Sequence, residues 1–182
     1  MNNFDYSAPK QIFATYIKKF TPSFSSTQKD LAVEMVNKLN DIVWLVNPEQ
    51  DSLKQMVDKL EEYAYQMATV KNIKVIVNIP EKIAGLKMSM DKRRNIYLLC
   101  KEAINNAAKY SNASLFELRI KDYDHSLEFL IKDNGKGFVV ETVKKGNGLE
   151  SMQKRAAEMG AKFHLESAPG QGTIISVQCK IT

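Results

Sequence analysis

The chain has 182 residues and a formal net charge of +5 at pH 7, with 44% hydrophobic and 26% charged residues. This composition is that of a soluble globular protein, and no run approaches the roughly 18 apolar residues of a membrane-spanning helix. The N-terminus lacks a secretion signal, and the lysines are scattered without interleaved aromatic residues. We therefore predict no membrane segment and no nucleic-acid partner. Cys100 and Cys179 lack a metal-ligand spacing, which favours reduced thiols packed in a cytoplasmic protein.

The first third of the chain is predicted to be helical. Residues 10–20 place apolar side chains at helical spacing, and residues 28–46 carry a second stripe with steps of four, four, three and four. That second stripe consists of Leu31, Met35, Leu39, Ile42 and Val46. One buried helix face of this kind can pack on a partner helix, and Asn47-Pro48 ends it. A third helix is predicted from residue 49 to about residue 70.

From residue 71 onward the pattern changes to strands mixed with helices. Residues 73–79 form a β-branched strand closed by Pro80, and residues 89–110 return to a helix. Strands 114–121 and 127–132 meet in a hairpin, a helix over 149–159 stops at Gly160, and strands 162–167 and 173–181 close the chain. Because strands meet as hairpins, a doubly wound fold is excluded. We predict an α/β sandwich with a mixed, largely antiparallel sheet.

Three polar residues share one face of the predicted helix 89–110. Glu102, Asn106 and Lys109 fall at positions i, i+4 and i+7. A carboxylate can polarise a nucleophile, a carboxamide oxygen can hold Mg²⁺, and an ammonium group can neutralise phosphate. By itself the triplet is better explained as an ordinary solvated polar stripe.

Glycine is concentrated at three G-x-G pairs, which hold six of the eight glycines in the chain: Gly135 and Gly137, Gly146 and Gly148, and Gly170 and Gly172. Asp133 precedes the first pair, where a buried carboxylate needs a donor such as the exocyclic amino group of adenine. The second pair precedes a helix, whose N-terminus favours phosphate. Taken alone, the Asp-Asn-Gly stretch is better explained as an ordinary turn, the second pair is a weak indication of a phosphate site, and the third pair also fits a hairpin turn.

Four stretches in order resemble the ATP-binding domain of bacterial sensor histidine kinases. They are "KEAINNAAKYSNA", "IKDNGKGF", "KGNGLESMQKRA" and "GQGTIISV", which stand as the N box, G1 box, G2 box and closing Gly-Thr of that family. The resemblance covers roughly residues 70–181 and implies a Bergerat-type (GHKL) fold, an α/β two-layer sandwich. Only residues 138–145 separate the G1 and G2 boxes, which is typical of the subgroup with a short lid.

The resemblance also implies a domain organisation. The stretch "LNDIVWLVNPEQDSL" is similar to the junction between the dimerisation helices and the ATP domain. We therefore expect part of a dimerisation hairpin over residues 1–47, a linking helix over 48–70 and the ATP-binding domain over 71–182.

Site roles follow from the same resemblance, with ATP and Mg²⁺ as cofactors. Asn106 would hold Mg²⁺, Glu102 would activate the incoming nucleophile, and Lys109 would contact phosphate. Asp133 would read adenine. The remaining positions would surround the base or shape the lid and phosphate site: Gly135, Gly137 and Thr173 at the base, and Gly146, Gly148 and Leu149 at the phosphates. Tyr110 departs from the subgroup, which commonly has histidine there.

The phosphoacceptor of the family is missing from this chain. His125 is predicted in a hairpin turn and His164 on a strand, so neither lies on a helix of the first third. We expect a protein histidine kinase module, homodimeric in its parent protein, that transfers the ATP γ-phosphate to a histidine on a missing segment. A response regulator receiver domain would then take the phosphate. Two alternatives remain: a serine kinase of the anti-sigma type, and a non-catalytic dimer scaffold.

Overall fold

The computed structural model describes residues 25, 28, 52–142 and 147–181. The chain divides into two compact units, residues 1–49 and residues 50–182, and the described elements belong to the second unit. The helices predicted over residues 10–20 and 28–46, together with the dimerisation surface inferred from them, lie outside the described residues.

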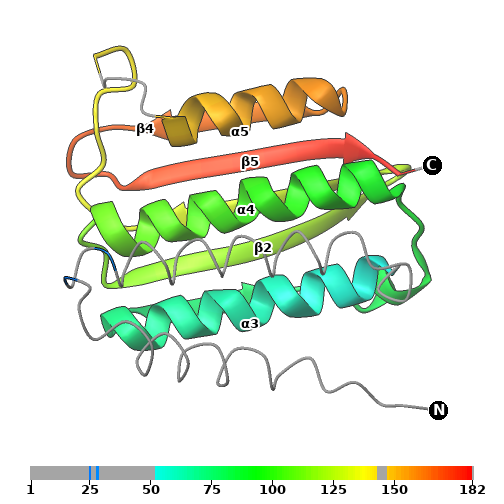
Figure 1. Ribbon diagram of the computed structural model, residues 1–182, viewed down its shortest axis with the longest axis horizontal. Helices are drawn as coiled ribbons and strands as arrows, with labels where there is room; N and C mark the ends of the chain where they lie inside the picture. Colours follow the sequence, from blue (N-terminus) through cyan, green and yellow to red (C-terminus); the bar gives the residue numbers. More distant parts are fainter. Residues whose placement is uncertain (1–24, 26–27, 29–51, 143–146, 182) are drawn as a thin grey trace. The chain divides into compact units, whose positions relative to one another are not determined.

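The second unit contains a five-stranded sheet with helices on one face (Figure 1). The strands pair in the order β1-β2-β3-β5-β4. Their bounds are β1 Lys74–Asn78, β2 Leu115–Tyr123, β3 Ser126–Asp133, β4 Lys162–Ser167 and β5 Thr173–Lys180. In this described sheet β1 pairs with β2 in parallel, and the other three pairings are antiparallel. The predicted two-layer α/β sandwich is confirmed.

Three helices form the second layer: α3 (Leu53–Lys71), α4 (Met90–Tyr110) and α5 (Asn147–Glu158). They lie side by side with α4 in the middle, where it contacts both neighbours and strands β3 and β5 (Figure 1). The 3-10 helix η2 (Glu81–Gly85) connects β1 to α4. The apolar face of α4 is buried and includes Ile96, Leu99, Cys100, Ala103 and Ala107.

The first described helix, α3, packs on α4 inside the second unit. Ser52 starts it with a capping box, in which its side chain and the Gln55 side chain each accept from the other residue's backbone N–H. Lys101 lies 4.7 Å from the Tyr63 ring centroid and Lys59 lies 5.6 Å from that of Tyr97, so cation–π contacts also join the two helices. The expected linking helix therefore belongs to the same unit as the sheet, because its apolar side is covered by α4.

The core lies between α4 and the alternating apolar positions of the sheet. Phe116, Leu118 and Ile120 alternate along β2 with less buried residues and are themselves buried. Cys100 and Cys179 are free and buried, as expected for packed thiols. Burial raises the pKa of Cys179 to about 11 and that of Cys100 further, so both stay protonated at neutral pH. Among the described residues, no helix has the length and hydropathy needed to cross a membrane.

The central hairpin differs slightly from its prediction. β2 continues to Tyr123 and β3 begins at Ser126, so the turn is shorter than the predicted 122–126. His125 makes this tight turn possible with a φ of 61°. At its other end β3 extends to Asp133 instead of ending at residue 132. Asp133 is thus part of the sheet, and its neighbours are set by strand pairing.

Candidate functional site

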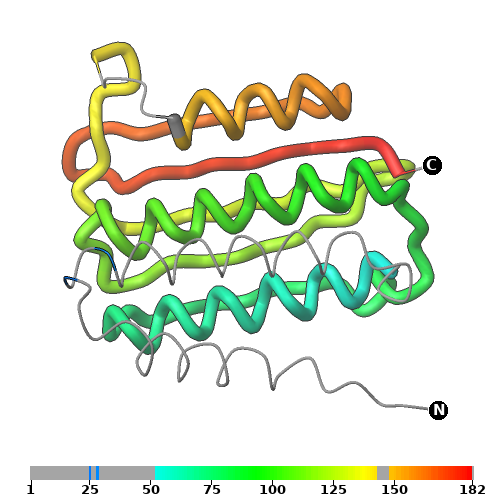
Figure 2. Tube along the Cα trace, viewed as in Figure 1, coloured from blue at the N-terminus to red at the C-terminus, as the bar shows by residue number. Residues whose placement is uncertain are grey.

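Several segments that lie far apart in the sequence meet at one end of the sheet. β3 ends there at Asp133 and β5 begins there at Thr173, and these two residues are direct partners in the β3–β5 register. On the other side, Asp133 pairs with Phe116 of β2. Figure 2 shows the chain after β3 and the β4–β5 turn at this same end, beside the last turn of α4. Since cross-strand partners point to one face of a sheet, the side chains of Asp133 and Thr173 lie together on the helix-covered face.

Asp133 is a buried carboxyl group with 5% relative exposure. Its Oδ1 accepts a hydrogen bond from the backbone N–H of Gly135 at 2.8 Å. Burial raises the pKa of Asp133, and backbone hydrogen bonds from Gly135 and Thr173 oppose that rise. A buried carboxylate costs free energy unless donors surround it, so a ligand that brings a further donor would be favoured here.

The neighbouring Asn134 has an anchoring role that the sequence did not indicate. Its Oδ1 accepts from the backbone N–H groups of Ser114 and Leu115 at 3.0 Å each, and its Nδ2 donates to Ser114 Oγ. The backbone N–H of Lys136 donates to the Ser111 carbonyl at 2.7 Å. These bonds fasten the segment after β3 to the start of β2 and to the C-terminal end of α4.

Glycines at this end allow the backbones of separate chain segments to approach each other closely. A Cβ at Gly135 would collide with the backbone and Cβ of Ser111. A Cβ at Gly137 would collide with the Ala168 carbonyl, and one at Gly172 with the Asp133 carbonyl. Gly137 and Gly172 also have positive φ angles of 57° and 73°, which side chains disfavour. At these positions glycine is thus required by the crossing of chain segments, whatever ligand the site holds.

Gly148 is different, because its missing side chain faces polar side chains. A Cβ there would collide with Glu102 Oε1 and would lie 3.3 Å from Glu102 Cδ and 3.6 Å from Asn106 Nδ2. The first turn of α5 thus lies against the polar face of α4. The structure thereby brings together Glu102, Asn106 and Gly148, which the sequence had placed in two separate motifs. Backbone N–H groups in the first turn of a helix have no partner within the helix, so this junction suits an anion.

The other predicted residues are placed as follows. Lys109 is exposed in the last turn of α4, about 10 Å along the helix axis from Glu102. Leu149 is half-buried in α5. Gly146 lies outside the described residues. His125 lies in the β2–β3 turn, and His164 is exposed on β4 beside Glu166.

Ser167, at the end of β4, is a site residue that the sequence analysis missed. Its Oγ accepts from the backbone N–H of Phe138 at 3.0 Å, donates to the Gly172 carbonyl at 2.9 Å and lies 3.1 Å from Thr173 Oγ1. Nothing distinguishes a serine at a strand end in the sequence, because its partners come from other segments.

The residues present fit a magnesium–phosphate group better than a bare metal ion. No cluster of three or more His, Cys, Asp or Glu side chains that could hold a metal exists among the described residues. Mg²⁺ bound with nucleotides takes one or two protein ligands and completes its shell with phosphates and water. The Asn106 amide and the Glu102 carboxylate, which lie beside Gly148, supply protein ligands of that kind and number.

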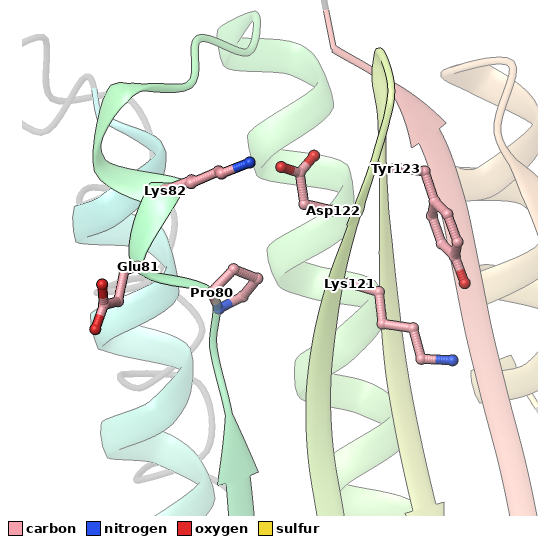
Figure 3. Close-up of a pocket in the computed structure, with 6 residues that line it drawn as sticks. All are labelled: Pro80, Glu81, Lys82, Lys121, Asp122 and Tyr123. Atoms are coloured by element: carbon pink, nitrogen blue, oxygen red, sulfur yellow. The ribbon is translucent and has the colours of Figure 1, made fainter.

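An open hollow exists at the opposite end of the sheet (Figure 3). It is lined by Pro80, Glu81, Lys82, Lys121, Asp122 and Tyr123. Lys82 and Asp122 point toward each other across it. None of the predicted site residues lines this hollow, which separates it from the site around Asp133.

Several known proteins are similar to this chain. The family of histidine kinase-, DNA gyrase B-, and HSP90-like ATPases matches residues 91–182. The sensor protein VraS of Staphylococcus aureus (strain COL) is 34% identical over 109 residues, which make up 59% of this chain and 31% of that protein. VraS of Staphylococcus haemolyticus (strain JCSC1435) is 33% identical over 109 residues. The chain therefore matches less than a third of the length of these relatives.

Solved structures share the fold. The histidine kinase domain from the Erythrobacter litoralis EL346 blue-light activated histidine kinase has a TM-score of 0.64 at 17% identity, covering 96% of this chain and 83% of its own. The Acinetobacter baumannii histidine kinase AdeS has a TM-score of 0.62 at 15% identity, covering 97% of each chain.

Proposed function

This chain belongs to the family of histidine kinase-, DNA gyrase B-, and HSP90-like ATPases, and on that premise we propose that it is the catalytic and ATP-binding module of a two-component sensor histidine kinase. The resemblance read from the four motifs is confirmed at the level of the family. ATP binding follows from family membership, whereas the residue roles, the magnesium ion, the acceptor and the partners are parts of the proposal.

One observation carries the proposal: Gly148 of α5 lies against Glu102 and Asn106 of α4. The contact provides a carboxylate, an amide and a helix N-terminus side by side. Asp133 and Thr173 provide a second polar pair near the C-terminal end of the same helix. We assign the first group to the phosphates and the second to the adenine base.

The residues of this site would then divide the work of phosphoryl transfer. Asp133 accepts a hydrogen bond from the adenine amino group, with Gly135, Gly137 and Thr173 shaping the space around the base. Gly146, Gly148 and Leu149 shape the phosphate site, where backbone N–H groups hold anionic oxygens. Lys109 neutralises phosphate charge from the exposed end of α4.

Chemistry at the γ-phosphorus would need a base and a cation. Glu102 takes the proton from the attacking imidazole nitrogen as the new P–N bond forms and the P–O bond to ADP breaks, an effect worth about 10²–10⁴-fold. Asn106 would hold Mg²⁺ through its side-chain oxygen. When bound, that ion neutralises phosphate charge and aligns the leaving oxygen.

The acceptor histidine and the later steps lie outside this chain. We propose a homodimeric parent protein acting in the cytoplasm, with the histidine on its dimerisation segment and a response regulator receiver domain as the next acceptor. The matched relatives are named sensor proteins, and the chain matches 31% of their length.

The test is transfer of labelled γ-phosphate from ATP to a separately supplied helical hairpin that bears the acceptor histidine. Transfer is expected with the wild-type chain and lost in Asn106→Asp, because an added carboxylate charge disturbs the phosphate and magnesium contacts. Asn105→Asp is the matched control: its side chain points about 100° away around α4, so transfer should persist. ATP binding without transfer to any acceptor would favour the non-catalytic scaffold instead.

A further inference from the structure

Ser167 occupies a junction that the proposed roles do not use. Its side-chain oxygen contacts the backbone N–H of Phe138, the carbonyl of Gly172 and the hydroxyl of Thr173. These partners belong to the chain after β3, to the β4–β5 turn and to the first residue of β5. We propose that Ser167 is a positioning residue that turns Thr173 into a hydrogen-bond acceptor and so makes the site select a ligand with an amino group. This inference rests on the proposed nucleotide-binding function.

The single proton of the Ser167 hydroxyl fixes the direction of its hydrogen bonds. A hydroxyl group has one proton to donate and two lone pairs to accept with. Ser167 donates its proton to the Gly172 carbonyl at 2.9 Å, and one lone pair accepts from Phe138 N–H at 3.0 Å. Its remaining contact is with Thr173 Oγ1 at 3.1 Å. Thr173 must supply the proton for that hydrogen bond, since Ser167 has none left.

As a consequence, the Thr173 hydroxyl can only accept a hydrogen bond from a ligand and cannot donate one. Its single hydroxyl proton is committed to Ser167, so only lone pairs remain for a ligand. Thr173 lies directly opposite Asp133 in the β3–β5 register, and an ionised carboxylate is also an acceptor only. Two acceptors side by side match an amino group, which has two N–H donors. The 6-amino group of adenine meets this requirement, whereas a base without a donor at that position offers neither acceptor a hydrogen bond.

The test compares two nucleotides that differ by this one group. Calorimetry would measure the affinities of the wild-type chain and of Ser167→Ala for ATP and for purine riboside triphosphate, which lacks only the amino group. The wild-type chain is expected to prefer ATP. In Ser167→Ala the Thr173 hydroxyl is free to rotate, so the preference should fall about fivefold, the value of one neutral hydrogen bond, mainly through weaker ATP binding. Ser167→Thr should restore it.

Two further variants make the result decisive. Ser126→Ala is the matched control, because its hydroxyl accepts from Gln178 at the opposite end of β3, and it should leave the preference unchanged. If Ser167→Ala does not fold, Ser167→Cys keeps the shape, and because its sulfur is only a weak acceptor for the Thr173 proton it should show a similarly reduced preference. Equal weakening of both nucleotides, or an unchanged preference, would overturn the positioning role. Failure of the wild-type chain to bind either nucleotide would overturn the proposed function itself.

Discussion

The carboxyl group of Asp133 affects both ligand recognition and the stability of the folded chain. Its side chain is buried, and burial raises its pKa despite backbone hydrogen bonds from Gly135 and Thr173. In the nucleotide-free protein a neutral group at this position would cost less free energy than a charged one, whereas recognition of an amino group needs the ionised acceptor. A site that binds through a partly unsatisfied buried charge therefore loses stability when empty and regains it on binding.

The raised pKa of Asp133 predicts a pH dependence of stability. The folded chain holds this proton more tightly than the unfolded chain, so the free energy of unfolding should fall as pH rises through the folded-state pKa. Urea unfolding between about pH 4 and 7 would measure this. Asp133→Asn should lack this component, whereas the exposed Asp122→Asn should retain it. Parallel stability curves for wild type and Asp133→Asn would contradict the prediction.

The glycines of the β4–β5 turn give a second test at the residue scale. Gly170 and Gly172 have similar φ angles of 78° and 73°, but a Cβ at Gly170 meets nothing within 4 Å, while one at Gly172 collides with the Asp133 carbonyl. Gly170→Ala should cost only backbone strain, about 1 kcal/mol, and Gly172→Ala should cost about 3 kcal/mol or more. Denaturant unfolding of the two variants measures the difference, and equal losses would refute the role of the collision.

At the scale of elements, α4 contributes one face to the core and another face to the site. Its buried face includes Ile96, Leu99 and Cys100, which hold the helix on the sheet. The half-buried Glu102 and Asn106 lie on another face, toward the start of α5. Because the apolar contacts fix the rotation of the helix about its axis, the core decides where these two polar side chains point.

Gly148→Ala should separate binding from stability at this junction. Alanine favours a helix over glycine by up to about 1 kcal/mol, and the group that its Cβ meets is the flexible end of Glu102. We expect an unchanged or slightly raised melting temperature with ATP affinity reduced about tenfold or more, because the shifted carboxylate and the added methyl crowd the phosphate site. Thermal unfolding and calorimetry measure both quantities. Gly85→Ala, at a position with open space, is the control, and unimpaired ATP binding by Gly148→Ala would argue against this location for the phosphates.

At the scale of the whole molecule, the described unit has two distinct ends. The site around Asp133 lies where β3 ends and β5 begins, and the hollow lined by Lys82, Lys121 and Asp122 lies at the other end. Helix α4 runs along the sheet between these two ends, and α3 and α5 pack on either side of it. Loss of an outer helix would therefore expose the helix that carries the site.

Truncation tests which residues make up the folding unit. A fragment of residues 50–182 is expected to unfold cooperatively and to keep the ATP affinity of the full chain within about threefold. A fragment of residues 71–182 lacks α3 and exposes the side of α4 that α3 covers, so it should lose cooperative unfolding. Circular dichroism during thermal unfolding distinguishes the two. A well-folded 71–182 fragment would instead support the predicted boundary at residue 71.

By itself, the sequence determined the three helices α3, α4 and α5 and the five strands of the second unit, but not η2, and it determined the family of the chain. The alternation on β2, the apolar face of α4 and the stop at Gly160 are local patterns, because side-chain periodicity reports which face of an element is buried. The order of the four motifs then identified the ATP-binding fold. The assignments of Glu102, Asn106 and Asp133 to ligand groups remain predictions.

Only the tertiary structure decided which segments touch. It showed that Gly135 and Gly172 are needed for contacts with the backbone of Ser111 and Asp133, that Gly148 faces Glu102, and that the Ser167 hydroxyl joins three segments. These contacts join residues far apart in the chain, and local patterns do not encode the distance between such residues. Strand register and helix packing set that distance, and both arise only when the whole sheet and its helices have assembled.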